Sequence, residues 1–333
     1  MNERGRPFQR NLDTKPMNQS MNRRELLAGG AIALGAALEV CAMTTTEAAP
    51  AAKTKGFRFC LNTSTIQGQK LSLEEEIEIA AKAGYHAIEP WIGEIEHYVQ
   101  SGKSLSDLRK RIHDHGMTVE DGIGFAEWIV DDDTRRAHGL ETAKRDMDLL
   151  AQLGCPHIAA PAAGATDQRN LDLRKAAERY AKLAEIGESM GVIPMVEVWG
   201  FSQCLTRLGE AALVAIESGY SKACILPDVY HLYKGGSPVN GLKLLSDSSI
   251  RVFHLNDYPA SPPPATITDA DRVYPGDGIA PLTEVFNILR GMNYDGVLSI
   301  ELFNKAYWQE DALKVARTAL EKARAAEQRS LEK

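Results

Sequence analysis

Met195-Val-Glu-Val198 is the first of four short β-prone runs that carry a metal-binding type of side chain at their ends. The others are Ile225-Leu-Pro-Asp228, Val252-Phe-His254 and Leu298-Ser-Ile-Glu301. If these strands are parallel and belong to one closed barrel, their carboxyl ends meet at the same mouth. An α/β barrel carries its chemistry at that mouth. The sequence therefore predicts that Glu197, Asp228, His254 and Glu301 converge on one site.

Outward from these runs, strand-like and helix-like patterns alternate from residue 57 onward. We expect strands at 57–63, 84–89, 118–123, 157–161, 193–198, 223–226, 250–255 and 297–300. Helical patterns fall between and after them, at 73–83, 105–115, 134–153, 171–190, 208–217, 239–245, 282–289 and 305–327. Eight such units in about 280 residues match a single (β/α)8 TIM barrel, an α/β fold. A doubly wound sheet is the rival fold, but no G-x-G-x-x-G follows the first strand.

The composition is that of an ordinary soluble globular protein, with 333 residues, 44% apolar and 25% charged. A net charge of −7 argues against a binder of nucleic acid or of anionic membrane surfaces. No linker divides residues 52–333, so we expect one domain there. Its four cysteines lie in or beside apolar runs without paired spacing, which predicts buried thiols: Cys60, Cys155, Cys204 and Cys224.

The first 51 residues have the pattern of a twin-arginine export signal followed by a linker. Arg23-Arg24 precedes an apolar stretch rich in small residues at 28–38, and a cleavage pattern stands at Ala49-Pro-Ala51. The apolar stretch is shorter than the ~20 residues of a membrane span. We therefore expect a periplasmic or secreted protein with no membrane association beyond export.

The residue types at the four strand ends suit a divalent cation, because carboxylates and an imidazole form a mixed oxygen and nitrogen ligand set. Glu197 and Glu301 follow apolar residues on strands that should be buried, where an unpaired carboxylate is costly. Two plainer interpretations stay open. Asp228 is also a suitable helix N-cap, and His254 is also compatible with a satisfied core histidine.

Two further residues are candidates for binding substrate oxygens. His231 lies three residues after Asp228, so one turn carries both side chains toward the same cavity. Arg272 begins the loop sequence Arg272-Val-Tyr-Pro-Gly-Asp-Gly278, and a guanidinium there suits a carbonyl or hydroxyl oxygen. Aromatic residues at expected strand ends suit either stacking on a sugar ring or core packing: Trp91, Trp128, Trp199 and Phe201.

Over residues 57–325 these motifs resemble the sugar isomerase/epimerase superfamily with a xylose isomerase-like barrel. That group includes ketose 3-epimerases, hydroxypyruvate isomerase, inosose dehydratase and endonuclease IV. The resemblance implies that Glu197, Asp228, His254 and Glu301 bind one divalent cation, Mn²⁺ first, with Mg²⁺, Co²⁺ and Zn²⁺ as alternatives. It further implies that Glu197 and Glu301 transfer protons, while His231 and Arg272 hold substrate oxygens.

The sequence departs from two members of that superfamily. Ketose 3-epimerases place a second glutamate six residues after the first, where this chain has Gln203, so we assign Gln203 to substrate binding. Endonuclease IV has an Asp-x-His in the loop after the seventh strand, where this chain has Asp271-Arg-Val. The nuclease also needs a basic face, which an acidic chain lacks.

The function that these residues predict is a sugar or keto-sugar isomerase or epimerase, which abstracts a proton next to a carbonyl through an enediolate. A lyase or dehydratase acting on a 3-keto sugar or an inosose is the alternative, because the same intermediate can expel a β-substituent. An abasic-site endonuclease and a non-catalytic sugar-binding barrel are remote alternatives. We expect a small carbohydrate as substrate, no nucleic-acid partner, and a homodimer.

Overall fold

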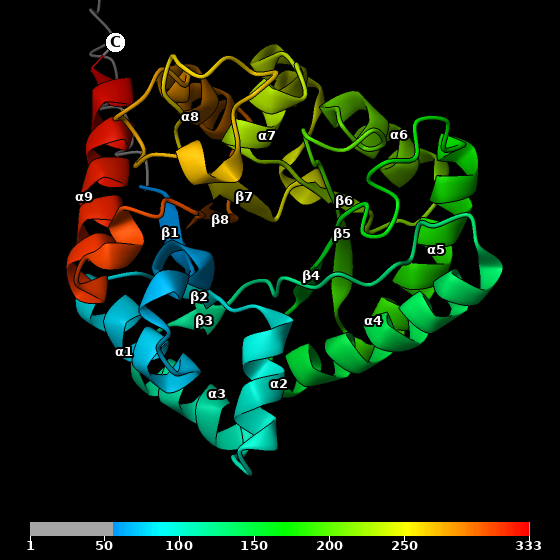
Figure 1. Ribbon diagram of the computed structural model, residues 1–333, viewed down its shortest axis with the longest axis horizontal. Helices are drawn as coiled ribbons and strands as arrows, with labels where there is room; N and C mark the ends of the chain where they lie inside the picture. Colours follow the sequence, from blue (N-terminus) through cyan, green and yellow to red (C-terminus); the bar gives the residue numbers. More distant parts are fainter. Residues whose placement is uncertain (1–55, 333) are drawn as a thin grey trace, which may run out of the picture. The chain divides into compact units, whose positions relative to one another are not determined.

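Eight short parallel strands form the centre of the computed structural model, which describes residues 56–332 (Figure 1). They are β1 (Arg58–Asn62), β2 (Ala87–Glu89), β3 (Thr118–Val119), β4 (His157–Ala160), β5 (Ile193–Glu197), β6 (Cys224–Leu226), β7 (Val252–Leu255) and β8 (Val297–Ile300). The described residues, 56–332, belong to one compact unit. The expected export signal lies outside the described residues and stays a prediction.

The strands follow the order of a closed barrel. Five are paired in the order β3-β2-β1-β8-β7 and three in the order β4-β5-β6, all of them parallel. Parallel bridges from Ile225 to Ile250 and from Asp228 to His254 join β6 to β7. The Ala159 N–H donates to the Gly122 carbonyl at 3.0 Å, which links the segment after β3 to β4. The predicted α/β barrel is confirmed.

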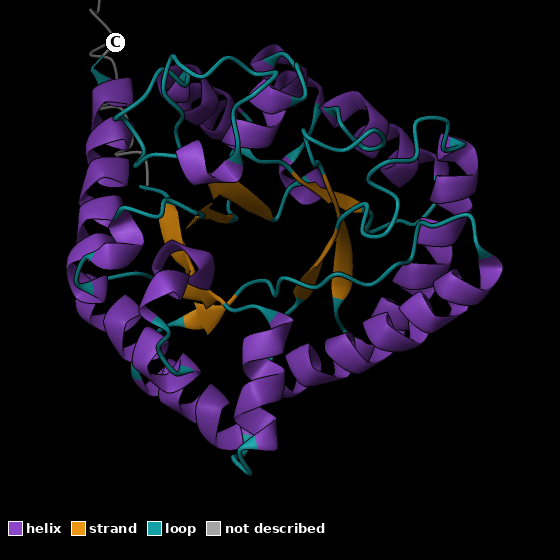
Figure 2. Ribbon diagram, in the orientation of Figure 1, coloured by secondary structure: helices purple, strands orange, loops and turns teal. Residues whose placement is uncertain are grey.

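Helices surround the strands on the outside (Figure 2). They are α1 (Leu73–Ala83), α2 (Ile92–Gln100), α3 (Leu105–Asp114), α4 (Asp133–Leu153), α5 (Leu173–Met190), α6 (Leu208–Glu217), α7 (Val229–Lys234), α8 (Leu282–Gly291) and α9 (Ala312–Leu331). Ser72 begins α1 with a capping box, and Gly84 ends it in the left-handed conformation. Within residues 56–332, none of the helices combines the length and hydropathy of a membrane span.

Three helix predictions were wrong in detail. The expected helix at 239–245 is a 3-10 helix, Val239–Leu244, and the α-helix between β6 and β7 is instead α7. Helix α2 was not predicted at all, because no helix was expected between 83 and 105. The last helix begins at Ala312 rather than near Lys305, because the Asp311 side chain accepts the N–H of Lys314 and caps it there.

Two hydrophobic clusters hold the barrel together. The larger one fills the space between strands and helices, and the smaller one fills the inside of the barrel. The inner cluster takes side chains from most of the strands, among them Cys60, Ala87, Met195, Cys224, Val252 and Val297. The four cysteines of the described residues are buried free thiols, as expected.

Candidate active site

The candidate site lies one layer above the inner hydrophobic cluster. Side chains along a strand alternate in direction, so residues two apart point to the same side. Two residues after the apolar side chains of the inner cluster therefore come polar ones, again directed into the barrel: Asn62, Glu89, Glu197, Asp228, His254 and Ser299. Each of these six is buried. The apolar layer closes the bottom of the barrel, and the polar layer faces its mouth.

Three of the four predicted metal ligands lie in one tight group. Asp228, His254 and Glu301 each offer a ligand atom, and these atoms lie within 4.8 Å of one another. His254 Nδ1 is 3.2 Å from a Glu301 oxygen and 3.8 Å from an Asp228 oxygen. Asp228 and Glu301 follow β6 and β8, and His254 lies within β7, the strand between them in the barrel. The strand-end pattern therefore brings together side chains up to 73 positions apart in the sequence.

Glu197 lies on the rim of this group at the end of β5. Its carboxylate lines the same cavity as Glu301, and the residue is only 4% exposed. Burial raises the pKa of Glu197 to about 8, against the lowering effect of His254. Among the described residues, its Oε2 atom has no hydrogen-bond partner. A buried carboxylate oxygen in that state is costly unless a cation or ligand meets it.

The chemistry of the group fits a divalent cation. Besides Glu197 Oε2, His254 Nδ1 is buried and has no hydrogen-bond partner within residues 56–332. Both atoms belong to the set of carboxylates and one imidazole that hard and borderline divalent cations prefer. Two buried lone-pair atoms without a hydrogen-bond partner among the described residues, a carboxylate oxygen and an imidazole nitrogen, fit the ligands of a divalent cation.

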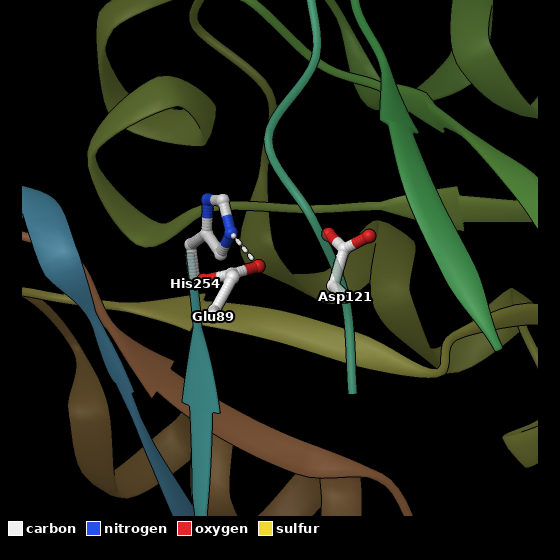
Figure 3. Close-up of side chains that lie close together, drawn as sticks. All are labelled: Glu89, Asp121 and His254. Carbon is white, nitrogen blue, oxygen red and sulfur yellow. Dashed lines mark hydrogen bonds and ion pairs between the residues drawn. The ribbon is translucent and has the colours of Figure 1, made fainter. Parts of the chain in front are cut away.

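On its Nε2 side, His254 lies near Glu89 of β2 and Asp121 of the segment after β3 (Figure 3). Asn62 of β1 and Ser299 of β8 bond in turn to Glu89. The His254 Nε2 atom is 3.0 Å from Glu89 Oε1, and Glu89 Oε2 accepts from the amide of Asn62 at 2.7 Å and from the hydroxyl of Ser299. Asp121 lies beside them, and burial together with the charge of Glu89 raises its pKa well above its usual range. Glu89 therefore favours the tautomer with the proton on Nε2, which leaves Nδ1 free.

The group formed by Glu89, Asp121 and His254 is a second constellation of metal-binding residue types. A second cation there would need the His254 Nε2 lone pair and hence loss of the Nε2 proton. That proton instead fits the 3.0 Å contact with Glu89. We therefore interpret these three residues as the support of the first ligand group rather than as a separate metal site.

Arg272 covers the ligand group on the side of the cavity, and its positive charge offsets part of the negative charge of the carboxylates. Its Nη1 donates to Asp228 and to Glu301, both at 2.8 Å, and its Nη2 donates to Asp269 at 2.6 Å. The guanidinium is buried and packs over the rings of Tyr230 and Phe303. The predicted loop arginine thus lies directly between two predicted ligands.

The loop that carries Arg272 is organised by Asp257. The Asp257 carboxylate accepts the backbone N–H groups of Gly276, Gly278 and Ala280 at 2.8–3.0 Å. A Cβ on Gly278 would stand 2.1 Å from the Tyr258 carbonyl oxygen, so only glycine fits there. This long loop is therefore a fixed structure that delivers a guanidinium to the mouth of the barrel.

His231 lies beside Arg272 and is neutral, because burial lowers its pKa to about 3. Its Nδ1 is 3.2 Å from the Gly200 N–H, and its Nε2 is 3.1 Å from Arg272 Nη2. A neutral imidazole has one N–H and one acceptor nitrogen, so it can accept only one of these bonds. The nitrogen that carries the proton therefore faces another N–H group, either that of Gly200 or that of Arg272.

A cavity of about 170 Å³ opens above these residues. Glu197, His231, Arg272 and Glu301 line its floor, and Asp269 lies at its edge. Five aromatic or apolar side chains of the upper strand ends complete the wall around it, together with Ile123: Trp91, Phe125, Trp199, Phe201 and Phe303. A larger cavity lies elsewhere, between α8, α9 and the Asp257 loop.

Residues 77–325 match the sequence profile of the xylose isomerase-like TIM barrel family. The chain belongs to this family. It is 26% identical to the inosose isomerase of Bacillus velezensis over 269 residues, which is 79% of this chain and 95% of that protein. It is 27% identical to the 3-dehydroshikimate dehydratase of Pseudomonas aeruginosa over 245 residues, which is 71% of this chain and 37% of that protein.

A solved structure of this family has the same fold. The crystal structure of the IolI protein with a bound zinc atom superposes with a TM-score of 0.76 at 21% identity. The match covers 82% of this chain and 99% of that one. In this xylose isomerase-like barrel, Asp228 is both a helix N-cap and a member of the ligand group. Its Oδ1 caps α7 by accepting the His231 N–H at 2.7 Å, while its Oδ2 faces the site.

Of the three predicted substrate-binding residues, His231 and Arg272 line this cavity and Gln203 does not. Its side chain is exposed and is not among the described residues that line the cavity. Trp128 is also absent from the wall, because it is buried in the core and its Nε1 donates to the Pro161 carbonyl at 2.8 Å. Gln203 and Trp128 follow strands, but the loops after those strands direct them elsewhere.

Sequence reasoning missed the residues that support the site from the first strands. Glu89 ends the run Ala87-Ile-Glu89, which has the same apolar-to-glutamate pattern as Ser299-Ile-Glu301. That pattern was a usable signal. Asn62, Asp121 and Asp269 had no comparable signal, since polar residues at such positions are common.

Proposed function

We propose that this protein is a divalent-metal-dependent isomerase or epimerase of keto-sugars or cyclic keto-polyols. The observation that carries the proposal is the pair of buried acids, Glu197 and Glu301, on one small cavity above the group of Asp228, His254 and Glu301. The two glutamates come from β5 and β8, which β6 and β7 separate. A substrate between them has one carboxylate on each of two sides.

The residues of this chain divide the work of a 1,2-proton shift or an epimerisation. One of the two glutamates removes the proton next to the carbonyl, and the other returns a proton on the opposite side or at the neighbouring carbon. Arg272 and His231 line the cavity beside these acids, and we assign them to the binding of the substrate oxygens. When bound, a divalent cation supplies positive charge that makes the adjacent C–H more acidic and stabilises the enediolate.

The named ligands are Glu197, Asp228, His254 and Glu301, with Mn²⁺ as the first expectation. The crystal structure of the related IolI protein contains zinc, so Zn²⁺, Mg²⁺ and Co²⁺ belong in the same test. Asn62 and Glu89 hold the far side of this group, so the ligand atoms are fixed before a cation arrives.

A dehydratase is the second candidate function. The relative from Pseudomonas aeruginosa is named a 3-dehydroshikimate dehydratase, and elimination starts from the same proton abstraction. Both activities need one base next to a carbonyl. They differ in the next step, in which the enediolate is either reprotonated or loses a β-hydroxyl.

Product analysis tests the proposal and separates the two candidates. Purified protein with Mn²⁺ is incubated with an inosose, and the products are followed by NMR and mass spectrometry. An isomer of unchanged mass supports the isomerase, and loss of water supports the dehydratase. We expect Glu197→Gln and Glu301→Gln each to lose roughly 10²–10⁴-fold in turnover.

The exposed Glu217→Gln on α6 serves as the control, because it makes the same chemical change far from the cavity. Its turnover should equal that of the wild-type protein. Full activity in both Glu197→Gln and Glu301→Gln would contradict the assignment of these acids to proton transfer.

A further inference from the structure

The wall of the cavity carries a continuous arc of aromatic rings. Neighbouring ring centroids are 5.1–6.1 Å apart along the whole arc, which runs through Phe303, Trp91, Phe125, Trp199, Phe201 and His231. The rings come from the segments after β8, β2, β3, β5 and β6. Most of the mouth of the barrel is therefore lined by one band of ring surfaces.

The cavity is small, and two of the rings that line it are half-exposed to solvent. The cavity measures about 170 Å³. Pockets for drug-sized ligands measure roughly 300–1,000 Å³, so this one has room for a single small ring. Phe125 and Phe201 are nevertheless 44% and 43% exposed, although both line the cavity. Large aromatic side chains that stay half-exposed at a site, next to buried catalytic groups, offer a surface for a ligand that projects out of it.

The charges at the site select against a phosphate on such a ligand. Among the described residues that line the cavity there is no lysine, and the single arginine is Arg272. Its Nη1 and Nη2 atoms already donate to Asp228, Glu301 and Asp269. The carboxylates of Asp269 and Glu301 face the same space and Arg272 is already paired with both, so an anionic group would meet repulsion that no further positive side chain of the lining offsets.

We propose that the substrate is a neutral, unphosphorylated ring compound with a second flat ring as a substituent. The polyol or keto-sugar ring occupies the cavity, and the substituent ring packs against Phe125 and Phe201, the two half-exposed rings of the arc. This outer subsite rests on the proposed function for the identity of the inner ring. The class of substrate is thus a glycoside-like molecule with an aromatic substituent, rather than a free sugar or a sugar phosphate.

Calorimetric titration of the Mn²⁺-loaded protein tests the subsite with unreactive probes. Phenyl β-D-glucopyranoside and methyl β-D-glucopyranoside share the inner ring and differ in the substituent. We expect the phenyl compound to bind roughly tenfold more tightly, because contacts between aromatic rings contribute binding free energy in addition to that of the apolar area they bury. Phe125→Ala and Phe201→Ala should each remove most of the ratio between the phenyl and methyl affinities, and this ratio is the readout because both residues also line the cavity.

Leu244→Ala is the matched control, because Leu244 is an apolar residue that is 90% exposed and lies outside this cavity. It should keep the wild-type ratio. A third probe, the 6-phosphate of the phenyl glucoside, should bind more weakly than the neutral compound. Equal affinities for the phenyl and methyl compounds, an unchanged ratio in both phenylalanine variants, or tighter binding of the phosphate would overturn the inference.

The experiments distinguish a failure of the outer subsite from a failure of the proposed function. If an unsubstituted inosose exchanges its proton with solvent while neither glucoside binds, the outer subsite is wrong and the proton-transfer site stands. If the phenyl preference depends on Phe125 and Phe201 but no keto-sugar exchanges a proton, the subsite stands and the proposed reaction is wrong.

Discussion

His254 shows how one residue connects the two halves of the site. Its Nδ1 faces the ligand group and its Nε2 faces Glu89, so the ring position depends on both. The strand-end pattern predicted His254 as a metal ligand because it stands at the end of its strand, as the three acids do. It could not predict which nitrogen faces the ligands, since that choice depends on Glu89, which is 165 positions away in the sequence.

A substitution of Glu89 tests this arrangement. Glu89→Gln keeps the shape of the side chain but removes the charge that orients His254, so we expect the affinity for Mn²⁺ to fall roughly 10–100-fold. Calorimetric titration of Mn²⁺ into metal-free protein measures it. Glu120→Gln, on the neighbouring strand segment but bonded to Arg58 and Thr118, is the control. Equal affinities in wild type and Glu89→Gln would show that Glu89 has no such role.

The elements illustrate what sequence patterns can and cannot predict. Strands such as β5 and β8 were predictable because a short continuous apolar run is typical of a parallel strand that is buried on both faces. Helix α2 was missed although Ile92, Ile95 and Tyr98 have helical spacing. At 239–245 the pattern was helical, but Pro238 and Gly241 flank and interrupt it, and the chain forms a 3-10 helix instead.

One prediction concerns the contact between α1 and α2. Glu76 on α1 is buried near Glu94 on α2, and burial raises its pKa from 4.5 to about 9. Between pH 4.5 and about 9, the folded protein therefore keeps a proton on Glu76 that the unfolded chain has lost. The contribution of Glu76 to stability is therefore fully present below pH 4.5 and is lost as the pH rises toward 9.

Glu76→Gln removes this titration. At pH 8 we expect the variant to be more stable than wild type by on the order of 1–3 kcal/mol, with little difference at pH 5. Urea unfolding at the two pH values measures the difference. The exposed Glu141→Gln on α4 should change neither value. A loss of stability for Glu76→Gln at pH 8 would contradict the proposed protonated state.

At the scale of the whole molecule, the barrel explains why residues from every part of the chain reach one mouth. The count of eight strand–helix units predicted this closure, and the parallel pairing of β1 with β8 confirms it. The aromatic arc could not be predicted as a unit. Trp91, Trp199 and Phe201 follow expected strands, but only the closed barrel brings them into line with Phe125 and Phe303.

The export signal is a further prediction at this scale. Replacement of Arg23 and Arg24 by lysine should block transport through a twin-arginine route while leaving the folded domain unchanged. Cell fractionation with mass spectrometry of the mature N-terminus measures this. Export of the double variant at the wild-type level, or an intact N-terminus outside the cytoplasm, would contradict the assignment of residues 1–51.

The central claim is that Glu197 and Glu301 exchange a substrate proton at a site that needs a divalent cation. The most direct measurement follows deuterium uptake from D₂O into an inosose by NMR, with the Mn²⁺-loaded protein and after chelation. We predict uptake at one carbon next to the carbonyl, abolished by the chelator and restored when Mn²⁺ is added back. Uptake that the chelator leaves unchanged, or no uptake at all with the metal bound, would contradict the account.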